Sequence, residues 1–185
     1  MPVNASNDNL GWLAPTFKLK NVSNDIMTLD QLKGNNGTVI AFICNHCPYV
    51  ISIAERLSFE AIELKKFSIN TIAIMSNDVT QYPQDSFENM KIFSKKYDFN
   101  FSYLYDETQK VAKSFGAVCT PDVFGFDGSL KLMYRGRIDS GVMNSNNSQI
   151  ERELYKAMLK IKNDGIGPTE QMNSFGCSIK WKNNE

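Results

Sequence analysis

The sequence predicts an α/β fold in which a central mixed β-sheet is flanked by helices. Two short apolar runs, residues 38–43 and 70–75, are separated by a longer amphipathic stretch that starts at Pro48. A strand, a helix and a second strand in this order form a βαβ unit, whose strands are parallel and whose crossover is right-handed. Residues 123–134 predict an antiparallel hairpin later in the chain. A sheet that contains both kinds of pairing is mixed, with helices covering its faces.

Composition indicates a single globular domain over residues 1–185, with no nucleic-acid or membrane partner. Hydrophobic residues make up 42% of the chain, and Lys+Arg and Asp+Glu number 20 each, so there is no basic surface to bind phosphates. No apolar run approaches the ~20 residues of a membrane helix, and the first residues lack the pattern of a secretory signal. We therefore expect a cytoplasmic protein. In that reducing compartment, four cysteines indicate catalysis or metal binding rather than structural disulfides.

The first third of the chain predicts an arm, a hairpin, a strand and a helix. Residues 1–13 are mostly polar and are expected to form an N-terminal arm. Residues 14–19 alternate and are followed after a turn by residues 26–29, which predicts a short hairpin. Residues 38–43 are almost continuously apolar, which is typical of a strand covered on both faces. Pro48 suits the first turn of the following helix, where its missing N–H group would have no partner.

The rest of the chain predicts elements that pack around this βαβ unit. They are the strand 70–75, a helix over 87–97, a strand over 101–105, a short helix ending at Gly116, the hairpin that turns at Asp127 and Gly128, a polar loop over 143–148 and a last helix over 150–161. Residues 164–185 form a C-terminal tail. Within it, Phe175, Ile179 and Trp181 give a pattern unlike that of a disordered end.

Cys44 and Cys47 form a C-x-x-C motif at the junction between the first predicted strand and its helix. The unpaired N–H groups and the dipole of a helix N-terminus stabilise a thiolate. Two intervening residues also let the two sulfur atoms meet within disulfide geometry. We therefore interpret this pair as a redox site, in preference to two small apolar residues at a helix start.

This order of elements, with the C-x-x-C motif and a later Thr-Pro before the hairpin, resembles the thioredoxin fold from about residue 14 to residue 161. Five stretches are similar to peroxiredoxin-like, AhpC/TSA-related redoxin-domain proteins of the thioredoxin family. They are residues 42–48, 103–109, 119–122, 134–137 and 176–182. The resemblance implies a thioredoxin fold with an N-terminal hairpin and a C-terminal tail, and a thiol–disulfide oxidoreductase activity.

The resemblance also implies a role for each residue near the motif. Cys44 would be the exposed nucleophile of low pKa, and Cys47 the more buried thiol that resolves the mixed disulfide. His46, the only histidine, would stabilise the Cys44 thiolate and make the disulfide more oxidising; the alternative is a solvated loop residue. Thr120 and Pro121 would form a cis peptide beside the dithiol, with backbone groups that pair with a substrate strand.

Cys119 and Cys177 are candidate additional thiols. Cys119 is a second resolving cysteine, a metal ligand or an inert buried thiol, and the sequence favours an inert or modulatory role. Cys177 has two interpretations that stay open. Either the apolar residues of the tail dock on the body and bring Cys177 to the active site, or they only pack and the thiol is incidental.

The expected reaction is thiol–disulfide exchange without a prosthetic cofactor. Protein or small-molecule disulfides would be the substrates, and a thioredoxin- or glutathione-type system would return the enzyme to its dithiol form. A peroxiredoxin-like thiol peroxidase acting on peroxides is the first alternative. Peroxiredoxins carry Ser or Thr three residues before the reactive cysteine. Here the residue three positions before Cys44 is Ala41, and the residue three positions before Cys47 is Cys44. Arg135 and Arg137 are candidate cations for a thiolate or ordinary hairpin charges.

A second alternative is a redox-sensing or metal-binding module without turnover. The four cysteines and His46 offer enough soft ligands for zinc or copper. Closely spaced ligand pairs do not occur twice, however, as they do in most structural zinc sites. We therefore expect no metal.

Overall fold

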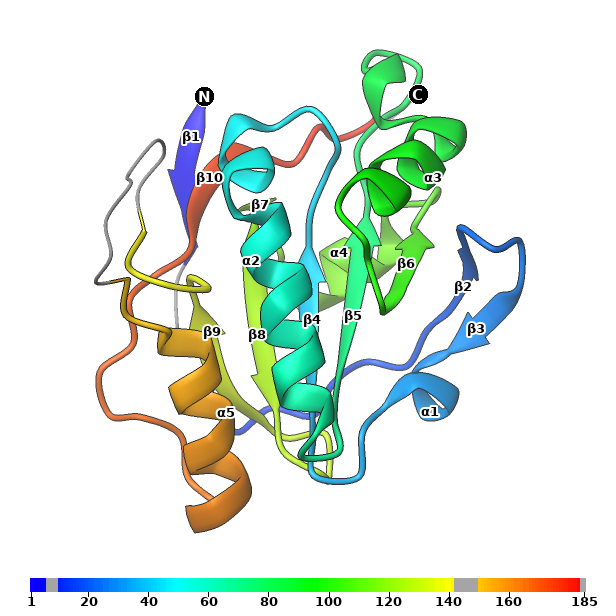
Figure 1. Cartoon of the computed structure of the whole chain (residues 1–185). Helices are drawn as coiled ribbons and strands as arrows, with labels where there is room; N and C mark the ends of the chain where they lie inside the picture. Colours follow the sequence, from blue (N-terminus) through cyan, green and yellow to red (C-terminus); the bar gives the residue numbers. More distant parts are fainter. Residues whose placement is uncertain (6–9, 142–149, 184–185) are drawn as a thin grey trace.

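The computed structural model describes residues 1–5, 10–141 and 150–183, and its centre is a seven-stranded mixed sheet of order β3-β2-β6-β5-β4-β8-β9 (Figure 1). Its strands are β2 (Lys18–Asn21), β3 (Ile26–Thr28), β4 (Gly37–Phe42), β5 (Ile69–Met75), β6 (Ser102–Tyr105), β8 (Asp122–Phe126) and β9 (Leu132–Gly136). A small second sheet has the order β1-β10-β7, formed by β1 (Pro2–Asn4), β10 (Phe175–Ser178) and β7 (Cys119–Thr120). The helices are α1 (Leu29–Leu32), α2 (Pro48–Lys65), the 3₁₀ turn η1 (Pro83–Asp85), α3 (Phe87–Lys96), α4 (Lys110–Phe115) and α5 (Glu153–Asp164).

The predicted βαβ unit is confirmed. β4 and β5 pair in parallel from Gly37 opposite Ile69 to Phe42 opposite Ile74, and α2 is the crossover between them. Every residue of β4 is buried, as the continuous apolar run predicts for a strand covered on both faces. β8 pairs antiparallel with the other edge of β4, so the sheet is mixed. These pairings place β4 near the middle of the sheet, directly before the two cysteines.

Helices cover both faces of this sheet, as predicted. On one face, α2, α3 and α5 pack against the strands through side chains such as Leu57, Phe93 and Met158. On the other face, α4 and α1 contribute Phe115 and Leu29 to a second cluster. Figure 1 shows α2 and α5 in front of the sheet and α4 behind it. The polypeptide therefore has the three layers of a thioredoxin-like α/β fold, with the end of β4 and the start of α2 at one edge.

Several predicted boundaries are wrong. The hairpin of β2 and β3 is confirmed, but its first strand begins at Lys18 rather than at residue 14. Helix α5 begins at Glu153, three residues later than its apolar pattern indicates. The predicted polar loop at 143–148 lies outside the described residues. No helix in the described part of the chain is both long and apolar enough to cross a membrane.

The N-terminal arm and the C-terminal tail are more ordered than predicted. Residues 2–4 form β1, which pairs antiparallel with β10 in the tail. β10 pairs in turn with β7, which directly precedes Pro121. The sequence missed this second sheet because β1 and β7 are only three and two residues long, too short for any alternating pattern. Strands from the N-terminal arm and the C-terminal tail thus pair with each other beside β7.

Candidate active site

Cys44 and Cys47 lie where β4 ends and α2 begins. Cys47 is the N-cap residue of α2, and Pro48 occupies the first helical position, as predicted. The N–H of Ile43 still donates to the carbonyl of Ile74 at 3.0 Å, so the chain leaves the sheet only one residue before Cys44. Both thiols are buried, with 1% of Cys44 and none of Cys47 exposed.

Thr120 contacts both thiols from the opposite side. Its hydroxyl lies 3.3 Å from Cys44 Sγ, and its backbone carbonyl accepts from Cys47 Sγ at 3.2 Å. The peptide bond between Thr120 and Pro121 is cis, which agrees with what the resemblance implies. The later Thr-Pro of the sequence and the early C-x-x-C motif therefore form one site.

The pKa of Cys47 is lowered to about 5, and that of Cys44 is raised well above its ordinary value. The Cys44 thiol is the strongest stabiliser of the Cys47 thiolate, and the Cys177 thiol and the backbone N–H groups of Val50 and Cys177 add to it. The positive end of the α2 dipole also favours a negative charge at this N-cap position. The Thr120 carbonyl accepts from the Cys47 thiol and so favours its protonated form. The several donors to the Cys47 sulfur have the larger effect, and the pKa of Cys47 is lowered. These contacts favour a thiolate on Cys47.

Cys44 is buried, whereas the resemblance implies an exposed thiol of low pKa. Cys44 donates to the Cys47 sulfur, is buried, and faces the negative charge of Asp85, and all three effects raise its pKa. The helix start explains the difference. Because α2 begins at Pro48, the amides of its first turn surround Cys47 rather than Cys44.

His46 forms a hydrogen bond with a buried carboxylate, close to the thiol that it was expected to stabilise. Its Nδ1 lies 2.8 Å from Asp85 Oδ2, and its ring stacks on Tyr82 with 5.5 Å between centroids. The hydrogen bond to Asp85 raises the pKa of His46, and partial burial opposes this. A ring nitrogen of His46 also lies within 4.8 Å of the Cys44 sulfur, and the expected stabilisation of a Cys44 thiolate by His46 stays a prediction.

Asp85 is a site residue that the sequence analysis missed. It is completely buried and accepts from the backbone N–H of Asn45 at 2.8 Å and from the side chain of Asn77 at 2.7 Å, in addition to His46. In the sequence it lies in an unremarkable polar stretch after Pro83. Only the fold brings it under the loop between the two cysteines, where three donors satisfy its charge.

One potential metal-ligand atom from each of Cys44, His46 and Asp85 lies within 4.8 Å of the other two, which is close enough for the three to share a metal ion. Asp85 already accepts from three donors, however, and one of them is His46 itself. Cys44 binds metals as a thiolate, and its pKa is raised. The donor set therefore suits a hydrogen-bonded redox site better than a cation site.

The structure brings Cys177 to the site and leaves Cys119 apart from the chemistry. Cys177 lies opposite Thr120 in the β10–β7 pair, and its thiol interacts with the Cys47 sulfur. Cys119 is buried, its thiol lies 3.5 Å from the carbonyl of Pro121, and burial and Asp122 raise its pKa far above the ordinary value. A thiol that is neutral and buried is a weak nucleophile.

Arg135 and Arg137 do not provide a cation for the thiolate. Arg135 is buried and forms an ion pair with Asp122 at 2.8 Å. Arg137 forms two hydrogen bonds, at 2.7 and 2.6 Å, to Glu153 at the start of α5. Both guanidinium groups hold elements of the scaffold together.

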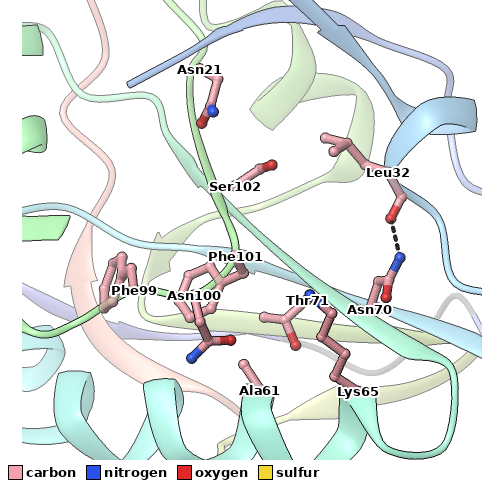
Figure 2. A pocket seen from close by; sticks show the side chains of 10 residues that line it. All are labelled: Asn21, Leu32, Ala61, Lys65, Asn70, Thr71, Phe99, Asn100, Phe101 and Ser102. Atoms are coloured by element: carbon pink, nitrogen blue, oxygen red, sulfur yellow. Dashed lines mark hydrogen bonds between the residues drawn. The ribbon is translucent and has the colours of Figure 1, made fainter. Parts of the chain in front are cut away.

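Two hollows lie on the surface near α2. One, of about 490 Å³, is at the C-terminal end of α2 beside Lys65, Asn70 and Asn100 (Figure 2). Since α2 has 18 residues, Lys65 is roughly 27 Å along the helix from Cys47. The second hollow, of about 430 Å³, includes Pro121 and Tyr49 and is mainly apolar. Only the second hollow reaches the residues next to the thiols.

The chain matches one protein-family model and several solved structures. Residues 10–135 match the model of the AhpC/TSA family. The structure of an uncharacterised conserved protein from Geobacillus kaustophilus is 40% identical, with a TM-score of 0.94 over 100% of this chain and 98% of that one. A hypothetical protein from Sinorhizobium meliloti 1021 is 32% identical, with a TM-score of 0.92 over 98% of this chain and 99% of that one.

A more distant structure shows the same fold. The thioredoxin domain of a thiol-disulfide oxidoreductase from Bacteroides vulgatus is 15% identical, with a TM-score of 0.64 over 83% of this chain and 98% of that one. No match was found among curated proteins. The predicted resemblance to the thioredoxin-like superfamily is confirmed, and the chain belongs to the AhpC/TSA family.

Proposed function

We propose that this protein is a thiol–disulfide oxidoreductase in which Cys47 is the nucleophile and Cys44 its resolving partner. The observation that carries the proposal is the set of donors around Cys47 Sγ at the N-terminus of α2, which lowers its pKa to about 5. A thiolate, not a thiol, attacks sulfur. At neutral pH the deprotonated form of Cys47 therefore predominates.

In the proposed reaction, Cys47 Sγ attacks a disulfide R–S–S–R′, forms Cys47–S–S–R and releases R′S⁻. Cys44 then loses its proton, attacks Cys47 Sγ and releases RS⁻, which leaves a Cys44–Cys47 disulfide. Once the Cys47 charge has been consumed, one cause of the raised pKa of Cys44 is gone, although the nearby Asp85 still opposes ionisation of Cys44. A thioredoxin- or glutathione-type reductant then restores the dithiol, and no prosthetic cofactor takes part.

Disulfides suit this site better than peroxides. Cleavage of a peroxide bond is helped by donors and cations that stabilise the leaving oxygen. Both candidate arginines are engaged elsewhere, and Cys44 stands three residues before Cys47, where peroxiredoxins carry Ser or Thr. Membership of the AhpC/TSA family keeps peroxidase activity as the second candidate, and the same thiolate would attack the peroxide oxygen.

The proposal is tested with Cys44→Ser and Cys47→Ser variants and a chromogenic aromatic disulfide. Cys44→Ser, combined with Cys177→Ser to remove the other neighbouring thiol, is expected to release one aromatic thiolate per molecule and to stop as a mixed disulfide on Cys47. Cys47→Ser is expected to lose both the rapid release and turnover. A stable mixed disulfide on Cys44 of the Cys47→Ser variant, formed at the wild-type rate, would reverse the assignment. Peroxide consumption, measured in parallel with a thiol donor, decides between the two candidate activities.

A further inference from the structure

The C-terminal strand β10 covers the edge of β7 beside the two cysteines. The strands are antiparallel, with Cys177 opposite Thr120 and Ser178 opposite Cys119. Figure 1 shows β10 between β1 and β7, close to the N-terminal end of α2. An extended substrate would bind by adding a strand to this same edge. The chain's own tail therefore occupies the place that a substrate strand would take.

The close approach of β10 depends on Gly176. A Cβ atom added to Gly176 would lie 2.1 Å from the carbonyl oxygen of Thr120, so no larger residue fits without moving the strand. On the other side of Cys177, the N–H of Ile179 donates to the carbonyl of Val118 at 3.0 Å, and the Ile179 side chain is buried. Cys177 thus lies between Gly176, which packs closely on Thr120, and Ile179, which is hydrogen-bonded to Val118.

This placement gives Cys47 two thiol neighbours. The Cys177 thiol and backbone N–H both stabilise the Cys47 thiolate. In turn, burial and the charge of Cys47 raise the pKa of Cys177 to about 11, so Cys177 is protonated while Cys47 is ionised. Cys177 is only half-buried, whereas Cys44 is buried. The thiol on β10 is therefore nearer to solvent than the partner within the C-x-x-C motif.

We propose that Cys177 is a second disulfide partner of Cys47 and that β10 delivers it as a substrate strand would. This inference rests on the proposed attack by Cys47. Once Cys47 carries –S–R, its negative charge is gone and no longer opposes ionisation of Cys177. Cys177 loses its proton to solvent and attacks Cys47 Sγ. The bond to R breaks, RS⁻ leaves with the electron pair, and RS⁻ takes up a proton.

The internal Cys47–Cys177 disulfide is then reduced by Cys44, the other thiol next to Cys47. Cys44 loses its proton and attacks Cys47 Sγ, the bond to Cys177 breaks, and the Cys177 thiolate takes up a proton. The product is the Cys44–Cys47 disulfide. Over the whole sequence the substrate disulfide gains two electrons and the Cys44–Cys47 dithiol loses them, while Cys177 returns to its starting state.

The experiment uses the full-length Cys44→Ser variant, oxidised with the thiol oxidant diamide and, separately, with oxidised glutathione. The expected product contains Cys47 and Cys177 joined in one cross-linked pair of peptides. Of its three cysteines, only Cys119 then remains free to alkylation after denaturation. Recovery of Cys177 as a free thiol, with Cys47 free or as a stable glutathione adduct, would overturn the proposal.

Two further variants in the Cys44→Ser background test the role of the strand. Gly176→Ala should displace β10 and sharply lower the yield of the Cys47–Cys177 disulfide. Ser178→Ala, in the same strand, should leave the yield unchanged. Circular dichroism shows whether each variant is folded. Equal yields from folded Gly176→Ala and Ser178→Ala proteins would overturn the role of β10.

Failure of this inference and failure of the proposed function give different results. If wild-type protein turns over disulfides but the Cys44→Ser variant forms no Cys47–Cys177 bond, the inference is wrong and the proposed function stands. If the bond forms with diamide but the wild type reduces no disulfide, the proposed function is wrong and the pairing of Cys47 with Cys177 stands.

Discussion

His46 Nδ1 lies 2.8 Å from Asp85 Oδ2, beneath the loop that joins Cys44 to Cys47. The same carboxylate accepts from the backbone N–H of Asn45 at 2.8 Å. One buried charge therefore fixes both residues between the cysteines, which sets the path of the chain into α2. The histidine of this C-x-x-C motif thus holds the loop through Asp85, and the charge of Cys47 also raises the pKa of His46.

Replacing Asp85 with Asn should lower the pKa of His46, because the hydrogen bond to the carboxylate is the largest cause of its rise. Since this is the only histidine, its ring protons can be followed through a pH titration by NMR without ambiguity. Asp25→Asn, on the exposed turn between β2 and β3, is the matched control and should leave the titration unchanged. An unchanged His46 titration in Asp85→Asn would contradict the assigned pair.

The pair between His46 and Asp85 also predicts how stability varies with pH. Because the pKa of His46 is raised in the folded state, its contribution is fully present below the unfolded value of about 6.5 and is lost as pH rises through the folded value. We expect His46→Gln to destabilise the protein more at acidic than at alkaline pH. Chemical denaturation at several pH values measures this difference. A difference between the two proteins that grows as pH rises would contradict the sign.

Arg135→Met should destabilise the fold without changing the thiolate. It would leave the fully buried Asp122 without its ion-pair partner, a loss that typically costs about 3–5 kcal/mol. The pKa of Cys47 should remain near its wild-type value, because Arg135 is not among the main causes of its shift. Chemical denaturation measures the first effect, and NMR of cysteine labelled at Cβ measures the second. A large rise in the pKa of Cys47 in this variant would show that Arg135 does stabilise the thiolate.

Tyr103→Phe tests whether the hydrogen bond from Tyr103 in β6 to Asn45 stabilises the loop between the two cysteines. The buried Tyr103 hydroxyl donates to the side chain of Asn45 at 2.9 Å. Its removal leaves the Asn45 oxygen without this donor and should lower the free energy of unfolding by about 1 kcal/mol. Tyr49→Phe is the matched control, since Tyr49 contacts Phe175 through its ring. Equal stability of the two variants would show that the hydroxyl contributes nothing.

The sequence predicted the central architecture because that part of the fold follows from local patterns. The buried run of β4, the proline at the start of α2 and the turn after β8 each have a local signature. The position of Cys44 and Cys47 at the strand–helix junction follows from the same signals. These features depend on periodicity and turn chemistry, which a single sequence carries.

The electrostatics of the site could not be read from the sequence. Which cysteine is ionised depends on where α2 begins to within one or two residues, and element boundaries are the least certain part of a sequence-based prediction. Asp85 and Cys177 reach the site through contacts that are distant in the sequence. Asp85, for example, is 39 residues from its partner His46. No local pattern marks a buried carboxylate in a polar stretch, and the apolar residues of the tail left the position of Cys177 open.

The ionisation of each thiol in the reduced wild-type protein tests the central claim most directly. The Cβ resonances of ¹³C-labelled cysteines follow each thiol through a pH titration without any reagent that must reach the buried sulfur, and single Cys→Ser variants assign them. We predict a midpoint of about 5 for Cys47, about 11 for Cys177 and a value well above the ordinary range for Cys44. An acidic midpoint for Cys44, with Cys47 protonated at neutral pH, would contradict the account.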